Sequence, residues 1–112
     1  MFERKNKRLT SHASAYIENV TAGDAFLKNI SITGCKLEHT ARIDGIVGET
    51  YKITIKPEAA SNTGFFDVVA ELRWINIDNC AYEAGFQIIE SPQGKFFERY
   101  VDYLAYRNIA LN

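Results

Sequence analysis

The 112-residue sequence predicts an all-β domain, a six-stranded antiparallel barrel with a C-terminal α-helix. Hydrophobic and polar residues alternate with a period of two along most of the chain, which is typical of β-strands. After residue 90 the period changes to helical spacing. The length and the 46% hydrophobic content are those of one soluble globular domain. We therefore expect a single domain with a flexible arm at residues 1–10, a barrel at 11–90 and a helix at 91–108.

Alternation and turn residues define three strands in the first half of the barrel, at residues 13–18, 25–32 and 35–40. In the first strand, small or aliphatic residues at 13, 15 and 17 share one face. Gly23 lies in a turn before the second strand, and Gly34 separates the second strand from the third.

The second strand carries an unusual pair of polar residues. Alternation assigns Phe26, Ile30 and Ile32 to one, core-facing side, so Asn29 and Ser31 are expected to project together from the other side. Two short hydrogen-bonding side chains would then stand on the outer barrel wall.

The second half of the barrel is expected to contain strands at residues 49–56, 65–76 and 82–90. Ile53 and Ile55 alternate with polar residues, and Pro57 ends that strand. In the next strand, the alternation from Phe66 through Leu72 continues to Trp74, which favours packing of Trp74 in the core over a role as an aromatic stacking surface. Residues 77–81 are expected to form a loop.

The closing helix has both a start signal and a periodic apolar face. Ser91 followed by Pro92 resembles an N-cap residue with proline at the first helical position. The apolar residues that recur at helical spacing are Phe97, Tyr100, Val101 and Leu104.

The charge is distributed unevenly. The net charge is −1, which argues against a general binder of long nucleic acids. Residues 1–8, MFERKNKR, nevertheless hold Arg4, Lys5, Lys7 and Arg8. A basic arm on a near-neutral body favours a small anionic ligand, although the same composition is typical of a solvated terminus.

The sequence carries no signature of an enzyme, a metal site or a membrane protein. The two cysteines, Cys35 and Cys80, and the two histidines, His12 and His39, show no metal-ligand spacing. No nucleophile motif or phosphate-binding loop is present, and no apolar run reaches membrane-spanning length. We therefore expect a cytoplasmic protein without catalytic activity, cofactor or membrane insertion.

Arginines four residues apart, at Arg4 and Arg8, suit forked contacts to phosphate and to the N7/O6 edge of guanine. Such an arm could close over a ligand that rests on Asn29 and Ser31, beside Gly34. A ligand with phosphates and guanine edges is a guanine nucleotide, and cyclic di-GMP offers both twice.

These residues resemble the two signatures of PilZ domains, which are bacterial receptors for cyclic di-GMP. Residues 4–8 read R-x-x-x-R and residues 29–34 read N-x-S-x-x-G. Leu72-Arg73-Trp74, Ala84-Gly85-Phe86 and the closing helix are also similar, so the resemblance spans essentially the whole chain. It implies a PilZ-like barrel and a binding site for cyclic di-GMP at Arg4, Arg8, Asn29, Ser31 and Gly34.

Two positions depart from the common pattern. Many members have an arginine where this chain has Glu3, which leaves open whether one ligand or a stacked pair binds. Asn29 replaces the commoner Asp and offers a single acceptor oxygen to guanine.

Three functions remain open from the sequence. The first is a receptor that orders its arm around cyclic di-GMP and signals to an unidentified effector protein. The second is an adaptor of the same fold that recognises a protein, for example in pilus or flagellar machinery, without a nucleotide. The third is a small barrel for single-stranded nucleic acid, against which the overall acidity argues.

Overall fold

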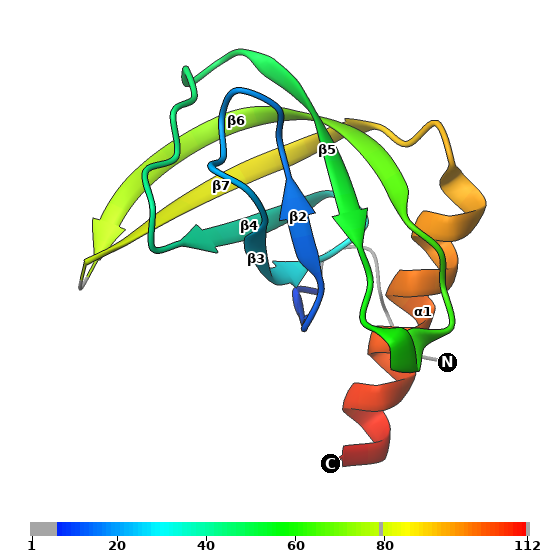
Figure 1. The fold of residues 1–112 in the computed structure, drawn as a ribbon. Coiled ribbons are helices and arrows are strands. Elements are labelled where there is room, and N and C mark those ends of the chain that lie inside the picture. Colours follow the sequence, from blue (N-terminus) through cyan, green and yellow to red (C-terminus); the bar gives the residue numbers. More distant parts are fainter. Residues whose placement is uncertain (1–6, 79, 112) are drawn as a thin grey trace.

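The computed structural model describes residues 7–78 and 80–111, which form the predicted antiparallel barrel with one C-terminal helix (Figure 1). Its elements are β1 (Leu9–Thr10), β2 (Ser14–Tyr16), β3 (Ala25–Ile30), β4 (Gly34–His39), β5 (Thr50–Lys56), the 3-10 turn η1 (Ala59–Ser61), β6 (Phe66–Asp78), β7 (Ala81–Glu90) and α1 (Gly94–Leu111). No helix in this described part of the chain is long and apolar enough to cross a membrane.

Six strands close the barrel in the order β3-β2-β5-β6-β7-β4, because β4 pairs with both β7 and β3. The short β1 also pairs with β3, at the opposite end from β2. β1 and β2 therefore follow one another along the same side of β3. The fold class predicted from the sequence is confirmed.

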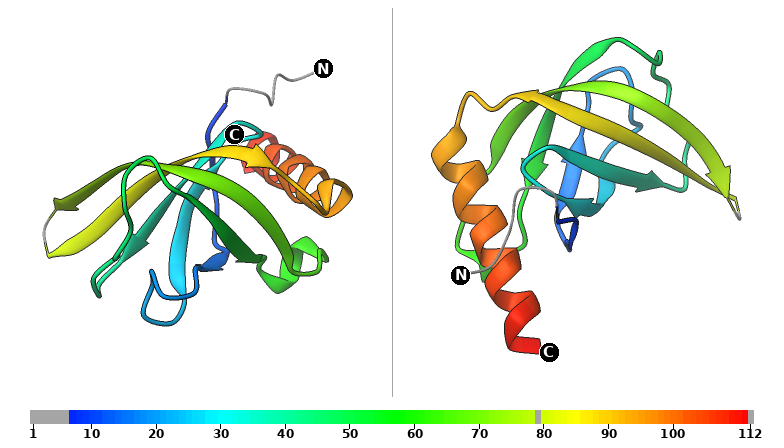
Figure 2. Two further views of the ribbon diagram at one scale, coloured as in Figure 1. Left: turned by 90° about the horizontal axis from the view of Figure 1, so that it is seen from above. Right: turned by 180° about the vertical axis from the view of Figure 1, so that it is seen from behind.

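The inward faces of the strands and one face of α1 form a single core. The expected inward residues Ala13, Ala15 and Ile17 are buried, as are Ile53 and Ile55. From α1, the rings of Phe97 and Tyr100 lie 5.9 and 6.0 Å from the ring of Phe66. Figure 2 shows α1 along one side of the barrel, where it contacts β1 and η1. The helix therefore packs onto the core that the barrel encloses.

The expected orientation of Phe26 is wrong, because β3 contains a β-bulge. The register with β4 shifts between Leu27 and Asn29, which makes Lys28 the extra residue. The bulge reverses the alternation: Leu27 is buried before it, Ile30 is buried after it, and Phe26 is 63% exposed. Asn29 faces outward as predicted.

Two predicted boundaries also move, the end of the arm and the start of the helix. Leu9 and Thr10, assigned to the flexible arm, pair with β3, and the buried Leu9 side chain packs in the core. The helix begins at Gly94, three residues after Ser91, because the Phe96 and Phe97 amides donate to the carbonyl of Gln93. Pro92 lies in the turn before the helix, a position that proline tolerates as well as the first helical one. The Gln93 side chain accepts a hydrogen bond from the Asp67 amide, which ties this turn to β6.

The hairpin between β6 and β7 is tighter than the expected loop at residues 77–81. β6 continues to Asp78 and β7 begins at Ala81. Cys80 has a positive φ of 67° at this reversal.

The bulge in β3 makes a test of two neighbouring residues possible. Leu27→Ala should lower the free energy of unfolding by about 2–5 kcal/mol, since it leaves a cavity in the core. Phe26→Ala should lower it by less than about 1 kcal/mol, since the ring is largely in solvent. Denaturant titration of both variants measures this, and equal losses would contradict the observed orientation.

Candidate ligand-binding site

A hollow of about 490 Å³ opens on the outer barrel wall, over β4, β6 and β7. Its lining residues are Arg8, Asn29, Thr33, Cys35, Lys36, Arg73, Trp74, Gly85, Phe86 and Gln87. Three of the five residues predicted from the sequence lie in or beside it: Arg8, Asn29 and Gly34. Small-molecule sites typically measure about 300–1,000 Å³, so the hollow is large enough for a nucleotide.

Arg8 enters the hollow because β1 holds the following residues against β3. Thr10 pairs with Asn29, and Arg8 Nη1 donates to Asn29 Oδ1 at 3.2 Å. Arg8 Nη2 lies 2.7 Å from the position that a Cβ at Gly34 would occupy. Gly34 has no positive φ. A Cβ there would also lie 2.8 Å from the backbone carbonyl oxygen of Phe86 in β7, so the fixed backbone of β7 requires a glycine here, and Arg8 uses the space that the glycine leaves.

Ser31 does not project beside Asn29, and that expectation is corrected. Its side chain is fully buried at 0% exposure, in the turn between β3 and β4. Its Oγ accepts hydrogen bonds from the Thr33 and Gly34 amides, both at 3.2 Å. The physical reason is that β3 ends at Ile30, so alternation no longer governs Ser31. Ser31 shapes the turn that presents Gly34 to Arg8.

Trp74 lies in the hollow and not in the core, which corrects a second expectation. The register between β6 and β7 shifts between Leu72 and Trp74, so Arg73 is the extra residue of another bulge. Leu72 is buried, whereas Trp74 is 42% exposed.

The indole of Trp74 covers Gly85, its partner across the strands. A Cβ at Gly85 would lie 2.3 Å from atoms of the indole. The glycine therefore lets the ring lie directly on the backbone of β7 and present its other face outward.

The lining is cationic: the described residues include Arg8, Lys36 and Arg73 but no acidic side chain. Neighbouring side chains orient two of these groups. Lys36 Nζ lies 3.5 Å from Glu83, and Arg73 lies 4.0 Å from Glu71 and hydrogen bonds to Gln87. At separations of 3.5 and 4.0 Å, and with each pair still partly accessible to solvent, these ion pairs are weak, so an anionic ligand can compete for the two cations.

Cys35 lies at the floor of the hollow and is fully buried. Burial raises the pKa of its thiol to about 12, and the charge of Arg8 opposes this only in part. The thiol is therefore neutral at physiological pH and acts as an apolar surface, not as a nucleophile or ligand.

The structure adds site residues that the sequence reasoning did not assign. Lys36, Arg73, Gly85 and Gln87 belong to it, and Trp74 was expected elsewhere. The similarity of residues 72–74 and 84–86 to the family was seen in the sequence. Their pairing with one another across β6 and β7 was not predicted. Arg4 lies outside the described residues. Within those residues, no group of three His, Cys, Asp or Glu side chains could hold a metal ion.

The contact between Trp74 and Gly85 has a direct spectroscopic test. Gly85→Ala should lift the indole from β7, moving the emission of this single tryptophan to longer wavelength and increasing quenching by acrylamide. Gly64→Ala is the control, because a Cβ there meets nothing within 4 Å. Identical spectra for Gly85→Ala and the parent protein would contradict the stacked position of the ring.

Comparison with known proteins supports the fold alone. No protein-family model matches the sequence, and no curated protein matches it. The solved structure of the Bacillus subtilis inhibitor of motility (MotI/DgrA) superposes with a TM-score of 0.72 at 16% sequence identity. The match covers 97% of this chain and 53% of the other, so this chain spans about half the length of that protein. The six-stranded barrel with its C-terminal helix is thus a fold that a motility inhibitor also contains.

Proposed function

We propose that this protein is a non-catalytic, cytoplasmic receptor for cyclic di-GMP that signals to a partner protein. The observation that carries the proposal is the convergence of Arg8, Asn29 and Trp74 on one cationic hollow. A guanine base needs a stacking surface and hydrogen-bonding groups at its edge, and a phosphate needs a cation. All three kinds of group are present within the same hollow.

Each part of the ligand has a candidate partner. The outward face of Trp74 suits stacking on guanine, which is worth about 1–3 kcal/mol per base. The Arg8 guanidinium suits a forked contact to N7 and O6 of guanine or to a phosphate. Lys36 and Arg73 add positive charge for the phosphates. Arg4, the first arginine of the arm, is proposed to close over the bound ligand.

Asn29 and Ser31 are proposed to act differently from one another. Asn29 Oδ1 already accepts a hydrogen bond from Arg8 and has a second lone pair for a guanine N–H. Ser31 acts through the turn that presents Gly34, since its hydroxyl group is buried there. We therefore propose direct contact for Asn29 and a shaping role for Ser31.

The proposed output is the ordering of the arm that precedes Arg8, which changes the surface that a partner reads. A ligand shifts partner binding only where the two states differ in their contacts with the partner. The shared fold with a protein named as a motility inhibitor makes motility machinery a reasonable class of partner. The alternative is an adaptor of this fold that binds such a partner without a nucleotide.

Calorimetric titration with cyclic di-GMP, with GTP and GMP as controls, tests the proposal. Arg8→Ala should weaken binding roughly tenfold or more, because it removes a charge-assisted contact worth about 1.5–3 kcal/mol. Arg42→Ala, which removes an exposed arginine outside the hollow, should leave binding unchanged. Absence of cyclic di-GMP binding by the parent protein would favour the nucleotide-independent adaptor.

The arm is tested separately. Arg4→Ala should weaken cyclic di-GMP binding by a similar factor without changing the melting temperature. Amide exchange across residues 3–8 should slow when the ligand is added to the parent protein. Unchanged exchange together with unchanged affinity of Arg4→Ala would exclude the arm from the site.

A further inference from the structure

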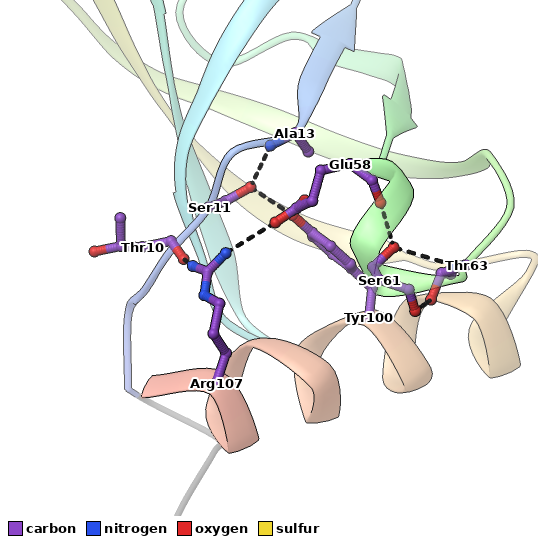
Figure 3. Close-up of polar contacts among 8 residues, drawn as sticks. All are labelled: Thr10, Ser11, Ala13, Glu58, Ser61, Thr63, Tyr100 and Arg107. Atoms are coloured by element: carbon purple, nitrogen blue, oxygen red, sulfur yellow. Dashed lines mark hydrogen bonds and ion pairs between the residues drawn. The ribbon is translucent and has the colours of Figure 1, made fainter. Parts of the chain in front are cut away.

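A cluster of polar side chains connects the N-terminal strand to the C-terminal helix, away from the hollow. We call Ser11, Glu58, Tyr100 and Arg107 the latch (Figure 3). Ser11 follows β1, Glu58 precedes η1, and Tyr100 and Arg107 belong to α1. Three segments far apart in the sequence thus meet in one hydrogen-bonded group.

Tyr100 is the centre of the latch. Its side chain is fully buried, and its hydroxyl donates to Glu58 Oε1 at 2.6 Å. Ser11 Oγ lies 2.7 Å from the hydroxyl oxygen of Tyr100. Because the Tyr100 hydroxyl donates its proton to Glu58, the Ser11 hydroxyl donates to Tyr100. Ser11 Oγ in turn accepts from the Ala13 amide at 2.9 Å. Burial raises the pKa of the Tyr100 hydroxyl, and the bond to Glu58 raises it further, so the group stays a donor.

Arg107 closes the latch from the next turns of α1. Its Nη1 lies 2.9 Å from Glu58 Oε2, in a pair that is mostly shielded from solvent. Its Nη2 donates to the carbonyl of Thr10, a residue of β1. The helix therefore holds the backbone of β1 directly, and holds Ser11 through Tyr100.

The segment held by the latch is the one that carries Arg8 into the hollow. Thr10 pairs with Asn29, and the Ser11 amide donates to the Lys28 carbonyl at 3.1 Å. β1 contains only two residues, and so short a strand gains little stability from its own pairing. Its position therefore depends on two further sets of contacts, the packing of the Leu9 side chain in the core and the hydrogen bonds of the latch.

We propose that Ser11, Tyr100 and Arg107 are positioning residues for Arg8, and that the latch couples the ligand site to α1. The proposal rests on the proposed function for its ligand. When the latch opens, β1 separates from β3 more often and Arg8 leaves Gly34. The fraction of molecules that hold Arg8 in the hollow then falls, and the apparent affinity for the ligand falls in proportion. By reciprocity, a bound ligand must hold α1 more firmly in place.

The first test is made without ligand. Tyr100→Phe removes the central hydroxyl and keeps the ring in the core. Amide exchange at residues 9–13 should become at least several-fold faster than in the parent protein. Tyr103→Phe is the matched control, because Tyr103 stacks beside Tyr100 without belonging to the latch, and its exchange should match the parent. Unchanged exchange in Tyr100→Phe would overturn the latch, whatever the titrations give.

The second test is a double-mutant cycle with cyclic di-GMP as the probe. Tyr100→Phe should weaken binding several-fold in the parent background and have little further effect in the Arg8→Ala background. A merely structural loss would instead lower affinity equally in both backgrounds, and that result would overturn the positioning role. If the parent protein binds no cyclic di-GMP, the proposed function and the coupling both fail, whereas the exchange data still decide whether the latch holds β1.

Arg107→Gln supplies a second variant in case Tyr100→Phe unfolds. It removes the charge of a side chain at the rim of the latch, with less disturbance of the core. It should accelerate amide exchange at residues 9–13. It should also lower the affinity for cyclic di-GMP in the parent background, with little further loss in the Arg8→Ala background. Affinity equal to that of the parent, despite faster exchange, would show that the strand moves without consequence for the site.

Discussion

Two β-bulges, at Lys28 in β3 and at Arg73 in β6, decide what faces the outside of the barrel where the hollow forms. In a closed barrel every regular strand alternates strictly between core and solvent. Each bulge places two consecutive side chains outward, and these include Asn29 and Trp74. Without the bulge in β6, Trp74 would enter the core beside Leu72 and the stacking surface would be lost. The bulges therefore allow one continuous core to coexist with a polar, aromatic hollow.

Two glycines complete this surface by leaving backbone uncovered. Arg8 lies on Gly34 and the indole of Trp74 lies on Gly85, each where a Cβ would be too close. β4 lies next to β7, with Gly34 opposite Gln87 and Lys36 opposite Gly85. The indole of Trp74 and the guanidinium of Arg8 thereby line the same hollow and lie directly on the backbone of the sheet. A stacking surface beside cations suits a planar anionic ligand better than an apolar pocket would.

The sequence predicted the barrel and its helix because most strands keep the period of two. It failed where that period breaks locally: Phe26 and Trp74 were misassigned because a bulge leaves no trace in hydrophobic alternation. Ser31 was misassigned for a related reason, since the strand ends one residue earlier. Lys36 and Arg73 could not be assigned to a site without the pairing of β4, β6 and β7. Arg8, Asn29 and Gly34 were predicted to lie together because their spacing resembles a family signature, and the structure does bring them together at the hollow.

The core and the hollow are connected through one short strand. Leu9 is anchored in the core, Arg8 precedes it in the hollow, and Thr10 and Ser11 follow it at the latch. Burying hydroxyl and carboxylate groups is costly unless each has a partner, and no buried side-chain nitrogen or oxygen in the described residues lacks one. Such a satisfied network has few alternative arrangements, so it fixes Ser11 relative to α1 more narrowly than apolar packing would. Displacing the backbone next to Arg8 therefore requires breaking either the pairing of β1 with β3 or the contacts of β1 with α1. Under the proposed function, this connection would let a ligand bound at one wall of the barrel alter a surface on α1.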